Sequence, residues 1–515
     1  MERKVRVRFA PSPTGPLHIG GMRTALYNYL FARQQGGDFL LRIEDTDQGR
    51  FVPGAEDYII EALKWCNISP NEGIGFGDGP HAPYRQSERK IMYREYVDKL
   101  IESGNAYYAF DTAEELEALR KNAEANKSSF AYNANTRKSL INSITITAEE
   151  CERKLKNGDH FVVRFKIPEM GQVMLKDIVR GDVVVEVSSL DDKVLFKSDG
   201  MPTYHLANVV DDYLMQITHV IRGEEWLPSA PLHVLLYRSF GWEQVMPQFA
   251  HLPLLLKPDG NGKLSKRDGD RLGFPVFPLN WTDPFTGEVS SGYRERGYSP
   301  EAFANMIAVL GWHPTGEQEL FSMDEMIKQF SLERVHKAGA KFDPEKTKWF
   351  NQQYLKKQTD IELAQSLSQY IEKQPKYSCI EESRKELVFL ETVCKLMREK
   401  VHFVHEIFDM APYFFFEPQS YDESVISKKW NDDAEKVIQT YLQSLQTETE
   451  VKSNRYEELF KATCADLNLK DGQFVQILRV CITGMSGGAA LYDTMALLGN
   501  DIVIARLKFA LNKLS

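Results

Sequence analysis

The chain has 515 residues, which at about 150 residues per domain predicts roughly three to four domains. Hydrophobic residues make up 43% and charged residues 26% of it, and this composition excludes a fibrous or mostly disordered protein. The formal net charge of -10 disfavours a protein that coats nucleic acid without specificity, although it does not exclude local basic patches.

Signals for membrane insertion or export are not evident in the sequence. No stretch approaches the ~18 uninterrupted apolar residues of a membrane span. Residues 1–13 lack the apolar core of a signal peptide and the acid-free, Arg/Ser-rich character of a transit peptide. The 6 cysteines are far apart and form no C-x-x-C pair, which favours reduced thiols over disulfides or a cysteine-rich zinc site. We therefore expect a cytoplasmic protein that makes no membrane contact.

The N-terminal part of the chain predicts a strand, a loop, a helix and a second strand. Apolar residues alternate with arginines over residues 5–9, the period of a strand with one polar face. The Pro/Gly-rich residues 10–21 predict a loop, and the helix that follows ends at Gly36 and Gly37. Residues 38–47 predict the next strand. Such a βαβ unit indicates that the protein begins with a parallel α/β sheet.

The pattern changes twice along the rest of the chain. Residues 88–200 combine helices with a β-rich part, and the α/β pattern resumes after them, so we expect a domain inserted between two halves of one fold. From about residue 320 helices dominate, which predicts an all-helical region of about 170 to 190 residues in two subdomains. Residues 273–297 are rich in Pro, Gly and aromatics and predict an ordered loop or insertion. One amphipathic helix face of the C-terminal region is formed by Leu387, Leu390, Cys394, Met397 and Val401.

The first chemical signal is the segment PSPTGPLHIGG, residues 11–21, between the predicted strand and helix. Unpaired N–H groups and the positive dipole end make a helix N-terminus a place where phosphate can bind. Gly20 and Gly21 lack Cβ atoms and would let a nucleobase or ribose lie against the backbone. His18 could donate a hydrogen bond to a phosphate. By itself the segment fits a Pro/Gly loop with a surface histidine equally well.

The second signal is KLSKR, in which Lys263, Lys266 and Arg267 lie within a glycine-flanked loop, residues 258–270. Mobile cations suit an arm that closes on a polyphosphate as charge builds up in a transition state. A solvated basic turn is the alternative for this segment taken alone.

Together the two segments resemble the HIGH and KMSKS signatures of class I aminoacyl-tRNA synthetases. The stretches APSPTGPLHIGG, RIEDTD, PTYHLANVVDD, VIRGEEWL and KLSKR are similar, nearly word for word, to bacterial-type glutamyl-tRNA synthetases. The resemblance covers residues 5–50, residues 200–270 and much of the C-terminal part, where GGAALYDTMALLG (487–499) also fits. It implies that L-glutamate, ATP and tRNA give glutamyl-tRNA, AMP and pyrophosphate, with Mg²⁺ on the ATP phosphates.

The resemblance also implies the architecture. It leads us to expect an α/β protein with a Rossmann-type parallel-sheet catalytic domain, an inserted α+β acceptor-binding domain and an all-α C-terminal anticodon-binding region, in a chain that acts as a monomer. The expected boundaries are 1–88 and 201–258 for the two catalytic halves, 89–200 for the inserted domain, 259–342 for the KLSKR loop and stem-contact domain, and 343–515 for the helical region.

The implied reaction needs little covalent chemistry from the protein. The carboxylate of glutamate itself attacks the α-phosphorus, so no protein nucleophile or general base is required, and catalysis reduces to positioning and charge stabilisation. The lysines of KLSKR would neutralise the phosphates as pyrophosphate leaves. The resemblance assigns catalysis to His18, Lys263 and Lys266, and ATP binding to His18, Gly20, Gly21, Glu225, Trp226, Lys263 and Lys266.

Glutamate recognition needs cations for two carboxylates and an anion for the ammonium group. Arg8 lies on the predicted polar strand face, and Arg222 ends an apolar strand, where α/β sheets hold ligands. A guanidinium can bind a carboxylate bidentately, and Glu44 is placed to receive the ammonium. A helix-capping acidic turn is the alternative for Glu44, Asp45 and Asp47, and it stays open for the last two. The glutamate contacts that the resemblance implies are Arg8, Ala10, Ser12, Glu44, Tyr204, Asn208 and Arg222.

The inserted region contains a basic stretch, residues 120–138, with five basic residues and one acidic residue. Phe130 and Tyr132 lie within this stretch. This composition binds phosphate backbones and stacks unpaired bases, although a solvated helix face is the alternative. The resemblance implies that this domain grips the acceptor end of tRNA. The predicted tRNA contacts are Arg120, Lys121, Lys127, Arg137 and Lys138.

One departure from the family pattern concerns metal. Many family members carry a zinc site in the inserted domain that begins with a C-x-C pair, and here Ala109 and Asp111 stand in those places. No cysteine lies between Cys66 and Cys151, so a tetrahedral thiolate site is not available. We predict no structural zinc and no other resident metal.

The sequence argues against three alternatives to a glutamate-charging enzyme. A glutamine-charging relative usually spells its loop P-x-P-N-G, unlike residues 11–15 here. A truncated paralogue that modifies a tRNA base lacks the helical C-terminal region. An RNA-binding regulator that has lost catalysis is disfavoured because His18, Lys266 and Arg222 are retained. The predicted partners are therefore L-glutamate and tRNA(Glu), and whether tRNA(Gln) is also charged stays open.

Overall fold

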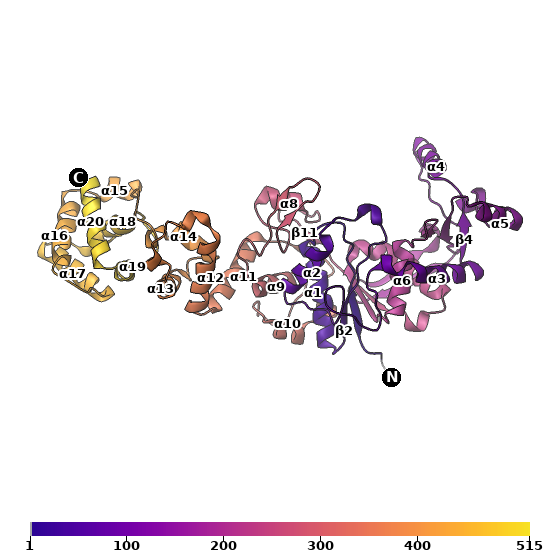
Figure 1. The fold of residues 1–515 in the computed structure, drawn as a ribbon, viewed down its shortest axis with the longest axis horizontal. Coiled ribbons are helices and arrows are strands. Elements are labelled where there is room, and N and C mark those ends of the chain that lie inside the picture. The colour runs from indigo at the N-terminus through magenta and orange to yellow at the C-terminus, as the bar shows by residue number, and fades with distance from the viewer. Residues whose placement is uncertain (1–2, 515) are drawn as a thin grey trace. The chain divides into compact units, whose positions relative to one another are not determined.

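The computed structural model describes residues 3–514, which divide into two compact units. The first comprises residues up to 296 together with 300–344, and the second comprises 297–299 together with the residues from 345 onward. Figure 1 shows that the first unit contains all the larger strands, whereas the second is built of helices.

A parallel sheet forms the centre of the first unit. β1 (Arg6–Phe9) pairs in parallel with β2 (Asp38–Leu41), and β2 pairs in parallel with β3 (Glu72–Gly73). On the other side of β1 lies β9 (His219–Gly223), which pairs in parallel with β10 (Gln248–Leu252). The resulting order β3-β2-β1-β9-β10 is that of a doubly wound sheet, and the predicted strand–helix–strand beginning is confirmed.

Two more strands extend the sheet beyond β10. β6 (Gln172–Asp177) pairs in parallel with β10, and β7 (Gly181–Glu186) pairs antiparallel with β6. We expected both strands in the inserted domain, 89–200, and that boundary is wrong for them. The alternation of apolar side chains in the sequence is the same whichever sheet a strand joins. The domain to which a strand belongs is therefore decided by the strand with which it pairs.

The first strand also differs from its predicted pattern. All residues of β1 are buried, including Arg6 and Arg8, which are 9% and 3% exposed. The predicted polar face is therefore wrong, because helices cover both faces of a parallel sheet and the arginines are buried through ion pairs instead. The crossover helix α1 (Ile19–Gln34) is likewise buried over most of its surface.

The inserted domain has its own small antiparallel sheet. Its strands β4 (Ala106–Ala109), β5 (Val162–Phe165) and β8 (Val194–Lys197) pair in the order β4-β5-β8. Helices α4 (Ala113–Ala125) and α5 (Ala148–Asn157) belong to the same domain, and Leu116 of α4 lies in one apolar cluster with Tyr107 and Ala109 of β4. This α+β domain is the part of the inserted region that stands apart from the central sheet.

The remaining elements of the first unit are helices and short strands. The segment predicted to be an ordered insertion, 273–297, carries a small hairpin made of β12 and β13, and this confirms that it is ordered. The helices are α2 (Ala55–Trp65), α3 (Lys90–Glu102), α6 (Tyr204–Leu214), α7 (Ala230–Ser239), α8 (Lys266–Leu272), α9 (Pro300–Ala308) and α10 (Met323–Gln329), and the strands are β11 (Leu255–Leu256), β12 (Trp281–Thr282), β13 (Val289–Ser290) and β14 (Ala340–Lys341).

The second unit is helical, as the sequence predicts. Leu390, Cys394 and Met397 are buried in its core on the predicted face of α13, whereas Leu387, the first residue of that helix, is exposed. In the part of the chain that the structure describes, no helix is both long and apolar enough to cross a bilayer. The helices are α11 (Pro344–Lys357), α12 (Asp360–Lys373), α13 (Leu387–Met397), α14 (Ile407–Met410), α15 (Glu423–Lys429), α16 (Asp432–Leu445), α17 (Ser453–Asp466), α18 (Asp471–Thr483), α19 (Leu491–Leu498) and α20 (Asn500–Leu514).

Candidate active site

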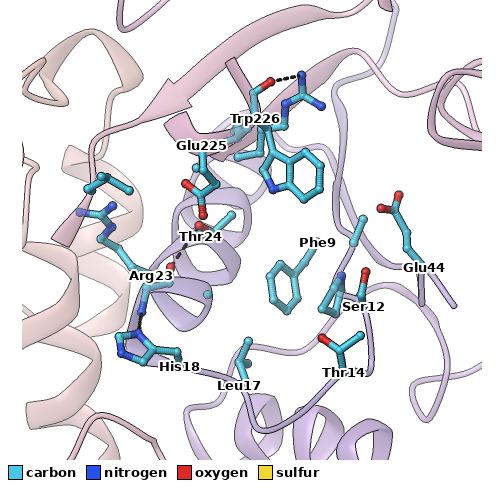
Figure 2. A pocket seen from close by; sticks show the side chains of 18 of the residues that line it. Phe9, Ser12, Thr14, Leu17, His18, Arg23, Thr24, Glu44, Glu225 and Trp226 are labelled. Carbon is cyan, nitrogen blue, oxygen red and sulfur yellow. Dashed lines mark hydrogen bonds between the residues drawn. The ribbon is translucent and has the colours of Figure 1, made fainter. Parts of the chain in front are cut away.

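A cavity of about 380 Å³ opens at the carboxyl ends of β1 and β9, beside the N-terminus of α1. Figure 2 shows His18, Glu225, Trp226 and Glu44 around it. Parallel sheets bind their ligands at this edge. The cavity brings together every predicted glutamate contact and, except for Lys266, every predicted ATP contact: Arg8, Ala10, Ser12, His18, Gly20, Gly21, Glu44, Tyr204, Asn208, Arg222, Glu225, Trp226 and Lys263.

His18 is the N-cap residue of α1. Its Nδ1 accepts a hydrogen bond from the backbone N–H of Gly20 at 3.2 Å, as Figure 2 shows. Burial, and then the charge of Lys263, lower the pKa of His18 to about 4, so the ring is neutral near pH 7 and its proton lies on Nε2. Among the described residues Nε2 has no hydrogen-bond partner. His18 therefore offers a free N–H donor at a helix N-terminus, an arrangement that suits a phosphate oxygen.

The two glycines of the first turn of α1 have different surroundings. A Cβ on Gly20 would lie 3.6 Å from Nδ1 of His18, an ordinary contact. A Cβ on Gly21 would lie 2.5 Å from Cδ1 of Leu17, so this glycine makes room for the leucine that lines the cavity floor. That a nucleobase or ribose lies against these glycines stays a prediction.

A buried cluster of charges includes Arg8 and Glu44, which line the cavity. Asp212 on α6 binds Arg8 at 2.9 Å and Arg42 at 2.8 Å. Burial opposes its ionisation, but the two arginines outweigh burial and hold the pKa of Asp212 below its usual value. Arg42 and Asn208 both donate to Oε1 of Glu44, at 2.9 and 3.0 Å. The described hydrogen bonds thus leave Oε2 of Glu44 for a cationic ligand.

Arg222 at the end of β9 is held by three uncharged groups. Its Nε donates to Nε2 of His251 at 3.0 Å and its Nη1 to the hydroxyl of Tyr204 at 2.8 Å. Its Nη2 donates to the backbone oxygen of Trp226 at 3.3 Å. Arg222 is only 5% exposed, and it forms no ion pair with any acidic residue among those described. A buried guanidinium without an anion is costly, so the site is suited to an anionic ligand.

The KLSKR loop places its two lysines differently. Nζ of Lys263 lies 3.5 Å from Oε1 of Glu225, at the rim of the cavity. Lys266 is the first residue of α8, and its Nζ contacts Oε1 of Glu288 at 2.9 Å, beside the hairpin of β12 and β13. Lys266 does not line the cavity. Because exposed ion pairs contribute little free energy, a polyphosphate can compete with this contact.

The acidic turn after β2 is structural at one position. Both carboxylate oxygens of Asp45 accept hydrogen bonds from Ser87, at 2.8 Å from its N–H and 2.5 Å from its hydroxyl, so the capping interpretation holds for Asp45. Asp47 is exposed and pairs with Arg50 at 2.7 Å. Arg50 lines the cavity and was not singled out from the sequence.

Part of the predicted tRNA surface is not available. Arg137 is 3% exposed, and its Nη1 donates to Asp192 at 3.0 Å and to the backbone oxygen of Ile167 at 2.9 Å. Its prediction as a tRNA contact is therefore wrong, since its charge is used inside the domain. Tyr132 is also buried, in a small apolar cluster against which Phe130 packs, so these rings are not an exposed stacking surface.

The other four predicted cations of the inserted domain are exposed. Arg120 and Lys138 form exposed ion pairs with neighbouring glutamates, at 3.2 and 2.8 Å. Lys121 and Lys127 have exposed side chains at the end of α4 and just after it. Their role in tRNA binding stays a prediction.

Ala109 and Asp111 both make contacts within the inserted domain. Ala109 is 1% exposed and belongs to the apolar cluster of the inserted domain. Asp111 accepts a hydrogen bond from the hydroxyl of Tyr132 at 3.0 Å and another from the backbone N–H of Ile141 at 2.9 Å. Within residues 3–514 no group of three or more His, Cys, Asp or Glu side chains is arranged to hold a metal ion.

Comparison with known families identifies the two units. Residues 4–349 match the model for the catalytic domain of the class I tRNA synthetases (E and Q). The chain belongs to this family. Residues 362–511 match an anticodon binding domain, which in this synthetase falls on the helical second unit. The family expected from the sequence is thereby confirmed, together with its α/β catalytic body and helical C-terminal region.

Curated relatives match this synthetase over its whole length. The glutamate–tRNA ligase of Cytophaga hutchinsonii is 54% identical, and the match covers 100% of this chain and 98% of the relative. The glutamate–tRNA ligase of Flavobacterium johnsoniae is 53% identical, and the match covers 100% of both chains. The crystal structure of a glutamate tRNA ligase from Elizabethkingia meningosepticum in complex with its amino acid superposes with a TM-score of 0.95 at 48% identity, covering 100% of both chains.

Proposed function

We propose that this synthetase activates L-glutamate with ATP to glutamyl-adenylate and transfers it to the 3′ end of tRNA(Glu), releasing AMP and diphosphate. The observation that carries this proposal is Arg222, a buried guanidinium without an acidic partner among the described residues, which faces the same cavity as Glu44 and His18. Glutamate supplies the carboxylates and the ammonium group that such a set of charges requires. The full-length likeness to glutamate–tRNA ligases supports the same function.

In this proposal the side-chain carboxylate of glutamate binds Arg222. A guanidinium has five N–H groups, and three of those of Arg222 are used by the protein, which leaves one on each Nη for the substrate. The hydroxyl of Tyr204 accepts from Arg222, and burial raises the pKa of Tyr204 to about 12, so its own proton is retained and can be donated to the ligand. Oε2 of Glu44 receives the α-ammonium.

The chemistry is carried by position and charge. ATP enters as its Mg²⁺ complex, and the neutral Nε2–H of His18 donates to a phosphate oxygen beside the N-terminus of α1. The α-carboxylate of glutamate attacks the α-phosphorus and diphosphate leaves. Lys263 at the cavity rim and Lys266, once released from Glu288, neutralise the charge that builds on the departing phosphates.

The tRNA is held at both of its ends in this proposal. The inserted domain binds the acceptor end through Arg120, Lys121, Lys127 and Lys138, which remain exposed. The helical unit, which matches an anticodon binding domain, reads the anticodon. We further propose that the enzyme works as a monomer in the cytoplasm, which fits the six cysteines being free thiols. Light scattering of the purified chain tests the monomer.

ATP–pyrophosphate exchange tests the function. Label from pyrophosphate should enter ATP when glutamate and tRNA(Glu) are both present, and not when glutamate is omitted. Parallel charging assays with tRNA(Glu) and tRNA(Gln) determine whether the second tRNA is also a substrate. If tRNA binds but no exchange occurs under any of these conditions, the chain is an RNA-binding protein without synthetase activity.

A further inference from the structure

Two buried residues behind Arg222 have no part in the reaction described so far. His251 on β10 is 0% exposed and Asp177 at the end of β6 is 2% exposed. Neither lines the cavity. They form a chain of hydrogen bonds that ends on Nε of Arg222: Oδ2 of Asp177 lies 2.6 Å from Nδ1 of His251, and Nε2 of His251 lies 3.0 Å from Nε of Arg222.

The protons in this chain have only one arrangement. Arginine can only donate, so Nε2 of His251 must accept and its proton must lie on Nδ1. Nδ1–H then donates to Asp177, which has to be ionised to take part. Burial opposes that ionisation, but the hydrogen bonds from His251 and from the backbone N–H of Arg180 lower the pKa of Asp177 below its usual value.

The carboxylate of Asp177 is itself fixed in orientation. Its Oδ1 accepts from the backbone N–H groups of Val179 at 3.0 Å, Arg180 at 2.8 Å and His251 at 3.3 Å. Oδ2 is therefore the oxygen that faces the imidazole. The pairing of β6 with β10 brings Asp177 to this place, so the strand extension that the sequence did not predict supports the cavity.

We infer that His251 and Asp177 are positioning residues for amino-acid selection, an inference that rests on the proposed function. Together they fix the histidine tautomer that accepts from Nε of Arg222, and this fixes the plane of the guanidinium. The remaining N–H groups on Nη1 and Nη2 are thereby directed at the side-chain carboxylate of the substrate. Geometry of this kind distinguishes glutamate from glutamine, because a guanidinium free to turn can accommodate an amide oxygen.

Asp177→Asn is the sharpest test because it changes no volume. The three backbone N–H donors require an oxygen at the Oδ1 position, so the new amide NH₂ must face Nδ1 of His251. A donor there forces the other tautomer, whose Nε2–H opposes Nε–H of Arg222. In exchange assays with tRNA, the KM for glutamate should rise about tenfold or more, while the KM for ATP and kcat change by less than about threefold.

A pair of substitutions at His251 separates the two hydrogen bonds. His251→Gln places an amide oxygen near the position of Nε2 and should keep most of the preference for glutamate over glutamine. His251→Asn reaches only the position of Nδ1, loses the bond to Arg222 and should lose that preference. His219→Gln is the matched control, because His219 lies on the same strand as Arg222 but outside the cavity.

The outcomes distinguish this inference from the proposed function. If the wild-type chain with tRNA does not activate glutamate, the proposed function fails. If the wild type is active and a folded Asp177→Asn protein keeps its KM for glutamate and its discrimination, the inference is overturned. An Asp177→Asn protein that loses activity equally with glutamate and glutamine would also overturn the inference. So would losses that are the same with both amino acids and the same in His251→Gln and His251→Asn, because they indicate a purely structural role.

Discussion

Arg8 donates two hydrogen bonds to one carboxylate, from Nε to Oδ1 of Asp212 at 2.9 Å and from Nη2 to Oδ2 at 3.1 Å. One edge of this guanidinium is therefore occupied, and its charge is balanced by the protein. Arg222 has no such anion among the described residues. We therefore propose that, of the two arginines expected to bind glutamate, Arg222 takes its counter-charge from the substrate, whereas Arg8 adds hydrogen bonds from an already paired group.

Replacing Lys266 should slow activation strongly. Lys266→Ala removes the cation that we propose follows the leaving diphosphate, and we expect kcat for pyrophosphate exchange to fall by about a hundredfold or more. The KM for glutamate should change much less, because Lys266 does not line the cavity. The neighbouring Arg267→Ala is the control, with near-normal turnover. Full activity of Lys266→Ala at saturating ATP would remove this lysine from the mechanism.

The stability of the protein should fall as the pH is lowered below about 6.5. Burial is the main cause that lowers the pKa of His18, His205 and His219 to about 4 in the folded chain. Between that value and the ordinary histidine pKa, the unfolded chain binds more protons than the folded chain, so the free energy of unfolding decreases as the pH falls through this window. Melting temperatures measured from pH 7.5 to 4.5 test this.

His219, which does not line the cavity, supplies the control for that titration. His219→Gln removes one titrating group and should flatten the dependence of the melting temperature on pH. This holds even if the substitution also changes the melting temperature near neutral pH. A wild-type melting temperature that stays constant from pH 7.5 to 4.5 would contradict the claim that buried histidines cause the loss of stability. A pH dependence unchanged in His219→Gln would contradict the part assigned to His219.

Many of the residues that line the cavity could be predicted from the sequence, whereas the buried residues that hold them in position could not. The loop that carries His18 and the strand end that carries Arg222 follow from local pattern and from resemblance, and both lie where expected. Asp212, Asp177 and His251 were not singled out, because each acts through a partner that is far away in the sequence. A buried acidic residue shows its role only when its cation is known.

Two corrections have the same physical cause. Arg8 was expected on a polar strand face and Arg137 on a tRNA-binding surface, because a cation in a sequence is most often solvated. Each is buried and paired with an aspartate, Asp212 or Asp192, that comes from a distant segment. Charge alone does not distinguish a ligand-binding cation from one that stabilises a domain.

Zinc should be absent from the purified protein. Elemental analysis without added metal should find less than stoichiometric zinc, and chelators should leave the melting temperature unchanged. Asp111→Ala should instead destabilise the inserted domain by about 1–3 kcal/mol, because Tyr132 and the backbone N–H of Ile141 lose their acceptor. One zinc per chain, or unfolding by chelators, would contradict this account.

Binding of tRNA should depend steeply on salt despite the net charge of -10. Phosphate contacts release counterions, so neutralising an exposed cation should flatten the salt dependence by up to about one unit of slope per contact. The variant to measure combines changes at Arg120, Lys121, Lys127 and Lys138.

Arg137 provides the matched control for that measurement. Arg137→Ala leaves Asp192 buried without its cation and should lower the stability of the inserted domain, but it should not change the salt slope of the folded protein. If the variant with all four cations neutralised keeps its affinity for tRNA and the same salt dependence of binding, the basic stretch is only a solvated surface.

The most direct test of the account is the ratio of kcat/KM for glutamate over glutamine, measured with tRNA in wild type, Arg222→Ala and Arg222→Lys. We expect Arg222→Ala to lose about a hundredfold or more of its kcat/KM for glutamate and much of its preference, because the side-chain carboxylate of the substrate loses the guanidinium proposed to bind it. Arg222→Lys should recover part of the activity, since it keeps the charge without the fork. Equal losses with both amino acids would contradict the account and leave Arg8 as the residue that recognises the side-chain carboxylate.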